Sequence, residues 1–155
     1  MPHPKVQVVI FSAPGQVLLL QTTTLRGSFW QNVTGSVEPG ETTLAAAARE
    51  LYEETSFNTP VRSTKYQFDF EHSCYQDPTR LEICREEVFY TLLPQALPPR
   101  MDPLEHQKFC WQDLATLSAN QYKFATSAMA LTSAYEICRQ EHPELTWPPS
   151  LTITG

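Results

Sequence analysis

The sequence predicts a single α/β domain in which a mixed β-sheet lies between helices. Apolar runs of strand length flank one helical segment in the first half of the chain, and a longer helical segment follows near the C-terminus. This order is typical of a sheet packed between helices. The chain of 155 residues is long enough for one substantial core. We therefore expect one domain over residues 1–155, with residues 146–155 as a loosely held tail broken by prolines.

The first two strands are expected at residues 5–11 and 17–20. The sequence Ser-Ala-Pro-Gly at residues 12–15 lies between them and favours a turn, so the two strands are predicted to pair as a hairpin. The first run is nearly continuous in apolar residues and the second is fully so, rather than alternating. Continuous apolarity predicts a sheet that is covered on both faces.

A predicted loop over residues 35–41 ends in a turn and leads into the mid-chain helix. Glu38–Glu41 places Pro and Gly at the two central positions of a type II turn. Thr42 or Thr43 can cap the helix, whose first turns hold four consecutive alanines. Four apolar residues recur at helical spacing on the face that we expect to be buried. They are Leu44, Ala47, Ala48 and Leu51.

The second half of the chain predicts further strands and two helices. Strands are indicated at residues 61–70, 88–93 and 107–111, and residues 81–83 form a short apolar run. The four prolines of residues 94–103 predict a loop. A short helix is expected from Asp113 and a long amphipathic helix over residues 122–140. The apolar stripe of the long helix is expected in the core, and consists of Phe124, Ala128, Leu131, Tyr135 and Cys138.

Charge and cysteine spacing exclude several classes of protein. The net charge is −6, which argues against broad binding to nucleic acid or membrane surfaces. No run is long enough and apolar enough to predict a transmembrane helix or a signal peptide, so a cytoplasmic location is expected. The four cysteines are scattered without a C-x-x-C pair, which predicts buried free thiols rather than a zinc site.

Carboxylates crowd one face of the mid-chain helix. Glu50, Glu53 and Glu54 are spaced by three and four residues, so they share that face. Arg49 can pair with Glu53, but one arginine does not neutralise these acids together with Glu41. A divalent cation would, and an oxygen-rich ligand set suits Mg²⁺ or Mn²⁺. A solvated acidic face is the alternative for such a helix taken alone.

The segment from Gly35 to Phe57 resembles the signature box of the Nudix hydrolases. The residues that carry the resemblance are Gly35, Glu41, Arg49, Glu50, Leu51, Glu53, Glu54 and Phe57. One position departs, because Ser56 stands where the family box has Gly. A Gly there usually forms a left-handed helix C-cap, so the substitution is expected to affect stability and leave the chemistry intact. The resemblance implies an α/β/α Nudix sandwich and a divalent-metal hydrolase.

The resemblance also implies roles for individual residues. The metal ligands that the resemblance implies are Glu53, Glu54, Glu50, the carbonyl oxygen of Gly35, and Glu105 from a later loop. Glu50 is either a ligand or the group that orients or deprotonates the attacking water. Glu41 would contribute through water or a neighbouring residue. Arg49 would act in catalysis by locking the loop to the helix.

Three residues upstream of the box are candidates for substrate binding. Phe29 and Trp30 could stack on a heterocycle or could pack under the sheet. Arg26 is a candidate phosphate contact. This region, together with Glu105-His106 and Trp111–Asp113, resembles the bacterial Nudix enzymes that hydrolyse dihydroneopterin triphosphate in folate synthesis. The resemblance implies release of pyrophosphate from that compound, and it is weak over residues 60–103.

Other Nudix activities remain alternatives at this stage. Nucleoside triphosphates and other substrates linked to a nucleoside diphosphate use the same box. A non-catalytic nucleotide sensor would be expected to lose box acids, and all of them are present here. An RNA 5′-pyrophosphohydrolase is disfavoured by the acidic balance. We expect a small phosphorylated pterin or nucleotide as partner, no nucleic acid or membrane, and a monomer or homodimer.

Overall fold

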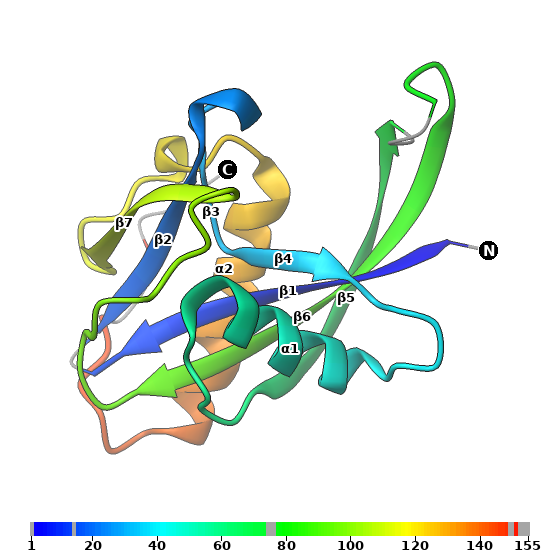
Figure 1. The fold of residues 1–155 in the computed structure, drawn as a ribbon. Coiled ribbons are helices and arrows are strands. Elements are labelled where there is room, and N and C mark those ends of the chain that lie inside the picture. Colours follow the sequence, from blue (N-terminus) through cyan, green and yellow to red (C-terminus); the bar gives the residue numbers. More distant parts are fainter. Residues whose placement is uncertain (1, 14, 74–76, 149–150, 152–155) are drawn as a thin grey trace.

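The computed structural model describes residues 2–13, 15–73, 77–148 and 151. Its helices are α1 (Thr43–Thr55) and α2 (Ala125–Glu141), with 3-10 turns η1 (Thr24–Arg26) and η2 (Ala119–Gln121) (Figure 1). The strands are β1 (His3–Ser12), β2 (Gln16–Thr22), β3 (Trp30–Gln31), β4 (Val33–Ser36), β5 (Arg62–Ser73), β6 (Leu81–Leu93) and β7 (His106–Asp113).

The strands form one mixed sheet in the order β3-β2-β1-β6-β5, with β4 paired to β1 and β7 paired to β2. Only β1 and β6 pair in parallel among the described strands. The predicted hairpin is present, but β1 and β2 pair only at Phe11↔Val17 and Ser12↔Gln16. Beyond these pairs the two strands diverge, and β3 and β4 fill the opening, with β3 on β2 and β4 on β1.

The two helices cover opposite faces of the sheet (Figure 1). Side chains of β1 alternate between the two layers, as successive residues of a strand must. Val6, Val8 and Ile10 pack in the core cluster that includes α1, whereas Val9 and Phe11 pack in the cluster that includes α2. The expected α/β/α arrangement, with the sheet covered on both faces, is therefore confirmed.

The strand bounds differ from the predictions in two places. The apolar runs at residues 81–83 and 88–93 belong to the single strand β6, because it pairs with β1 and β5 through the charged residues between them. Gly35 and Ser36 end strand β4 rather than lying in the loop that precedes the helix.

The helix predictions also need correction. No helix begins at Asp113, which ends β7 and is followed by a turn. The last helix begins at Ala125 instead of Tyr122, which leaves Phe124 exposed at the N-cap. On α1, Leu44 and Ala48 are exposed, and the buried residues are Ala46, Ala47, Leu51, Glu54 and Thr55. Hydrophobic spacing alone did not identify this face because it contains a buried carboxylate.

The end of the chain is only partly described. Trp147, in the expected tail, packs edge-on against Phe11 and Tyr135, while residues 149–150 and 152–155 lie outside the described part. Cys84 and Cys138 are buried free thiols as expected and Cys110 is half-buried, whereas Cys74 is not among the described residues. Within the described ranges, no helix is long and apolar enough to span a membrane.

Candidate active site

The loop before α1 is a tight turn that leads directly into the helix. Gly40 has a φ of +79°, and the backbone N–H of Glu41 donates to the carbonyl of Glu38 at 3.0 Å. A type II turn requires this left-handed residue, as the Pro-Gly pair predicted. Thr42 Oγ1 then accepts a hydrogen bond from the Ala45 N–H at 3.1 Å, which caps the helix. The loop therefore connects the end of β4 directly to the start of α1.

Arg49 joins this loop, the end of β4 and the acids of α1. Its Nε and Nη2 donate to the two carboxylate oxygens of Glu41 at 2.8 and 3.0 Å, and Nη2 also donates to the Ser36 carbonyl at 2.9 Å. Its Nη1 reaches Glu50 at 2.9 Å and Glu53 at 3.2 Å. The hydrogen bond from Arg49 lowers the pKa of Glu41 to about 2. Such bidentate, charge-assisted bonds fix the loop against the helix.

Gly35 makes room for the carboxyl group of Glu50. A Cβ atom on Gly35 would lie 2.0 Å from Glu50 Cδ, which is far inside contact distance. The requirement is steric, since Gly35 is not among the residues with positive φ. Burial raises the pKa of Glu50, against hydrogen bonds from Glu54 and Arg49 that lower it. The carboxyl of Glu50 is thus held against the β4 backbone in a partly desolvated place.

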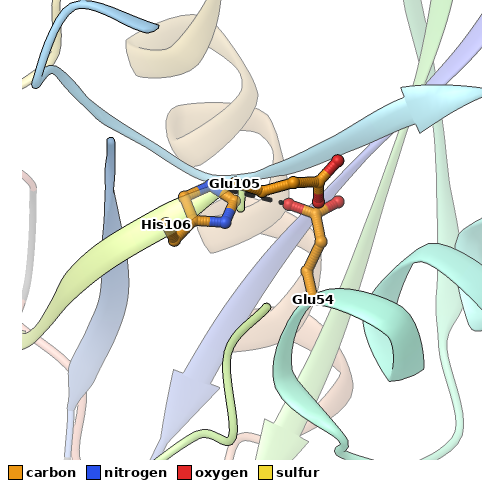
Figure 2. Close-up of side chains that lie close together, drawn as sticks. All are labelled: Glu54, Glu105 and His106. Atoms are coloured by element: carbon orange, nitrogen blue, oxygen red, sulfur yellow. Dashed lines mark ion pairs between the residues drawn. The ribbon is translucent and has the colours of Figure 1, made fainter. Parts of the chain in front are cut away.

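Glu54 in the last turn of α1, Glu105, and His106 at the start of β7 lie close together (Figure 2). One potential ligand atom from each of the three lies within 4.8 Å of the others. Glu54 Oε1 is 3.7 Å from His106 Nε2. Burial, with the nearby charge of Arg26, lowers the pKa of His106 to about 4, so the imidazole is neutral at pH 7.

Two buried atoms of this cluster lack hydrogen-bond partners among the described residues. They are Glu54 Oε2 and His106 Nδ1, and Glu54 is only 2% exposed. Burial, followed by the charges of Glu50 and Glu105, holds the pKa of Glu54 well above its usual range. A divalent cation would provide a partner for Glu54 Oε2 and offset the crowding of like charges. The residues present therefore fit a divalent metal, with oxygen ligands suited to Mg²⁺ and an imidazole that Mn²⁺ also accepts.

A pocket of about 430 Å³ lies on the α2 side of the sheet. Phe29 and Phe124 line it and contact each other edge to face, with ring centroids 5.3 Å apart. Glu86 and Gln7 line it from the sheet. Its size and its mixture of apolar walls with a few polar groups are typical of a small-molecule site.

The sequence matches the NUDIX domain over residues 1–132. This match covers most of the chain and includes every element from β1 to the first part of α2. The chain belongs to the Nudix family. The prediction of a Nudix hydrolase, made from the box at Gly35–Phe57, is therefore confirmed.

Two relatives and one solved structure are similar to this Nudix chain. It is 33% identical over 115 residues to the dihydroneopterin triphosphate diphosphatase of Haemophilus influenzae, a match covering 68% of this chain and 71% of that protein. The structure of the E. coli dihydroneopterin triphosphate pyrophosphohydrolase superposes with a TM-score of 0.71 at 28% identity, covering 83% of this chain and 91% of that one. A region of 101 residues is 36% identical to an octanoyltransferase of Myxococcus xanthus, covering 65% of this chain and 27% of that protein.

The fold of this Nudix domain brings some of the predicted site residues together and separates others. Glu105 lies beside Glu54 although the two are far apart in the sequence, and Arg26 Nη2 lies 3.9 Å from Glu105 Oε1. The Glu53 side chain is 54% exposed and contacts Arg49, outside the group formed by Glu54, Glu105 and His106. The assignment of Glu53 as a ligand stays a prediction.

The two predicted aromatic contacts also differ in position. Phe29 lines the pocket, with Lys123 Nζ 4.7 Å from its ring centroid, whereas Trp30 packs against the core cluster on the α2 side. Sequence reasoning missed His106 as a site residue. The signal that could have found it is its place directly after Glu105, at the first residue of β7.

Proposed function

We propose that this Nudix hydrolase is a divalent-cation-dependent pyrophosphohydrolase that converts dihydroneopterin triphosphate to its monophosphate and pyrophosphate. The proposal draws its substrate from the names of the two dihydroneopterin triphosphate hydrolases to which the chain is similar. Both matches cover two thirds or more of each partner, and both exceed 25% identity. The geometry of the site supports the same substrate class.

The observation that carries the proposal is the arrangement of two sites on the two faces of β3 and β4. On the α1 face Gly35 accommodates Glu50, and the Glu54 cluster lies alongside. On the α2 face Thr34 and Gln31 line the pocket, and Gln31 Nε2 lies 3.0 Å from His106 Nε2. A ring held in the pocket can therefore extend its phosphate chain past Gln31 toward the carboxylates.

The acid cluster supplies the binding site for the cation and the phosphate chain. Glu54, Glu50, Glu105, His106 and the carbonyl of Gly35 are the groups that would hold one or more divalent ions. The metal, when bound, neutralises phosphate oxygens and lowers the pKa of water. Arg26, whose side chain is half exposed beside Glu105, places a positive charge where phosphate oxygens would arrive.

The remaining chemistry is proton transfer and positioning by the chain itself. The oxygen of water forms a bond to a phosphorus, the bond between that phosphorus and the pyrophosphate oxygen breaks, and a carboxylate takes the proton of the water. Glu50 and Glu105 are the two candidates for this base. A raised pKa suits Glu50 to that task. Arg49 and Glu41 hold the loop in place and touch no reacting atom.

The test is a comparison of substrates under one set of conditions. Pyrophosphate and phosphate release would be measured with Mg²⁺, and again with Mn²⁺, on dihydroneopterin triphosphate, the common nucleoside triphosphates, ADP-ribose and 5′-triphosphorylated RNA. A kcat/KM preference for the pterin with pyrophosphate as product supports the proposal. A preference for a nucleotide would keep the box chemistry and reject the pterin substrate. Tight binding of one compound without turnover of any would favour a nucleotide sensor.

A further inference from the structure

A series of buried hydrogen bonds connects Tyr122, just before α2, with the floor of the pocket. The Tyr122 hydroxyl donates to Asn32 Oδ1 at 3.0 Å, Asn32 Nδ2 donates to Gln7 Oε1 at 2.7 Å, and Gln7 Nε2 donates to Glu86 Oε1 at 2.6 Å. Each of these four residues is at most 5% exposed. They come from four different segments of the chain, so this is a built arrangement rather than a local turn.

A backbone carbonyl fixes the donor and acceptor roles along this series of hydrogen bonds. Asn32 Nδ2 also lies 3.3 Å from the carbonyl oxygen of Ser127, which can only accept. The amino group of Asn32 must therefore face that carbonyl and Gln7 Oε1, which turns the amino group of Gln7 toward Glu86. The series of hydrogen bonds therefore ends at Glu86, which accepts.

The carboxyl of Glu86 keeps acceptor capacity for a ligand. Gln7 is the one described residue that hydrogen-bonds it, and it occupies a single site on Oε1. Oε2 and the second lone pair of Oε1 accept nothing from the described residues, and Glu86 lines the pocket together with Gln7 and Phe29. A buried carboxylate with unused acceptor sites favours a partner that offers N–H groups.

We propose that Glu86 is the specificity-determining residue of the pocket and selects rings that present two adjacent N–H donors, as the 2-amino-4-oxopyrimidine edge of pterins and guanine does. This inference rests on the proposed function for the place of the ring, and extends it to the group that recognises the ring. The ring N–H and the exocyclic amino group of such an edge would both donate to the Glu86 carboxylate, while Phe29 and Phe124 provide the apolar walls.

Adenine is the informative contrast because its matching edge has a different pattern. It places one amino donor beside a ring nitrogen that carries a lone pair, and this lone pair would face the carboxylate. A site that hydrogen-bonds one pattern rejects the other, because a polar group is left unpaired. Discrimination between guanine and adenine nucleotides therefore reports on Glu86 even if the natural substrate is not a pterin.

The experiment is the variant Glu86→Gln, measured as kcat/KM on dihydroneopterin triphosphate, GTP and ATP. Gln7 continues to donate, so it fixes the new amide with its oxygen toward Gln7 and its amino group toward the pocket. We expect kcat/KM to fall about ten- to a hundredfold for the pterin and GTP, while ATP turnover stays within about threefold or rises. Glu82→Gln is the matched control, because Glu82 lies on the same strand outside the pocket. It should change neither the ratio of pterin to ATP turnover nor the ratio of GTP to ATP turnover.

The possible results distinguish a wrong role for Glu86 from a wrong substrate for the enzyme. An unchanged ratio of GTP to ATP turnover in a folded Glu86→Gln variant would overturn the role of Glu86 and leave the pterin activity standing. If the wild type hydrolyses none of the three compounds, calorimetric binding of neopterin and adenosine gives the readout, and weaker binding of neopterin alone in the variant supports the inference. Should Glu86→Gln fail to fold, Glu86→Asp withdraws the oxygens by one methylene and should lower the same ratio.

Discussion

The sheet separates two buried carboxyl groups that differ in their neighbours. Glu54, on the α1 side, is 2% exposed and leaves Oε2 without a partner among the described residues. Glu86, on the α2 side, is 3% exposed and accepts a hydrogen bond from Gln7. The two carboxyls are equally buried, and each keeps an oxygen that accepts nothing from the described residues. Their neighbours differ, with acids beside Glu54 and an amide beside Glu86, which indicates different uses. An oxygen left unpaired among other acids suits a cation, whereas an oxygen placed at the end of a chain of amides suits an N–H donor.

The largest expected effect is loss of turnover in Glu54→Gln. Removing this carboxylate removes the buried oxygen that a cation would use, so we expect kcat to fall about a hundred- to a thousandfold. The free energy of unfolding without metal should stay the same or rise, because the variant no longer buries an unpaired carboxyl among acids. Steady-state kinetics and urea denaturation measure the two quantities.

The exposed neighbour Glu53 provides the matched variant. Wild-type protein should gain thermal stability on addition of Mg²⁺ by mass action, and Glu54→Gln should lose most of that gain. Glu53→Gln tests whether the exposed acid is also a ligand, in which case metal-dependent turnover should be abolished. Unchanged turnover in Glu53→Gln would remove Glu53 from the ligand set, and unchanged turnover in Glu54→Gln would contradict the whole cluster.

The next largest effect is the pH dependence of stability due to Glu86. Burial raises the pKa of Glu86 to about 7, from 4.5 for an ordinary Glu, against the hydrogen bond from Gln7. The folded state therefore holds the proton more tightly than the unfolded state. The resulting stabilisation is fully present below pH 4.5 and is lost as the pH rises through 7, by up to about 3 kcal/mol.

The measurement is the difference in unfolding free energy between wild type and Glu86→Gln from pH 4.5 to 8. Taking the difference cancels other titrating groups such as His106, whose lowered pKa makes stability rise with pH between about 4 and 6.5. The wild type should lose stability relative to the variant across this range. A difference that is constant with pH would mean that Glu86 is ionised without cost, and would weaken the contrast with Glu54.

A smaller effect is expected from Gly35→Ala. The new Cβ would occupy the place of the Glu50 carboxyl, and Glu50 must swing away because the backbone cannot. We expect kcat to fall roughly ten- to a hundredfold through misplacement of Glu50, with a loss of about 2 kcal/mol in stability. In a Glu50→Ala background the same change should cost almost no stability, and a full cost there would show that the clash lies elsewhere.

The two sites differ in how far the sequence could predict them. The α1 side is encoded mostly within Gly35–Phe57, where spacing places Glu50 and Glu54 on one face and the Pro-Gly pair indicates the turn. Glu105 was found only through the family resemblance. His106 was missed because its role depends on the pairing of β7 with β2, which brings it beside Glu54.

The α2 side could not be predicted because its parts are distant in the sequence. Glu86 lies just before the predicted strand at residues 88–93, yet in the structure it is buried within β6, where Gln7, 79 residues away in the sequence, donates a hydrogen bond to it. Asn32 is the single residue between β3 and β4, and its partner Tyr122 lies 90 residues further on. Periodicity does not report such pairs. The exposed Leu44 shows the converse, since an apolar residue at helical spacing was wrongly assigned to the core.

The smallest predicted effect concerns Ser56, which lies beyond the α1 residues of the site. It caps α1 with φ +65° and donates its N–H to the Tyr52 carbonyl at 2.8 Å. Ser56→Gly should relieve the left-handed conformation and raise the unfolding free energy by about 0.5–1 kcal/mol, with kcat unchanged. Ser28, with φ +54°, is a second left-handed serine, and Ser28→Gly measures the same relief outside the helix.

A loss of stability in Ser56→Gly would have a specific structural meaning. Ser56 Oγ donates to the Arg100 carbonyl at 3.3 Å, and the Arg100 N–H donates to the Thr55 carbonyl at 2.8 Å. These bonds tie the end of α1 to the proline-rich segment that leads to Glu105. If Ser56→Gly lowered both stability and kcat while Ser28→Gly did not, the serine at the box position would be an anchor for the loop that delivers Glu105 to Glu54.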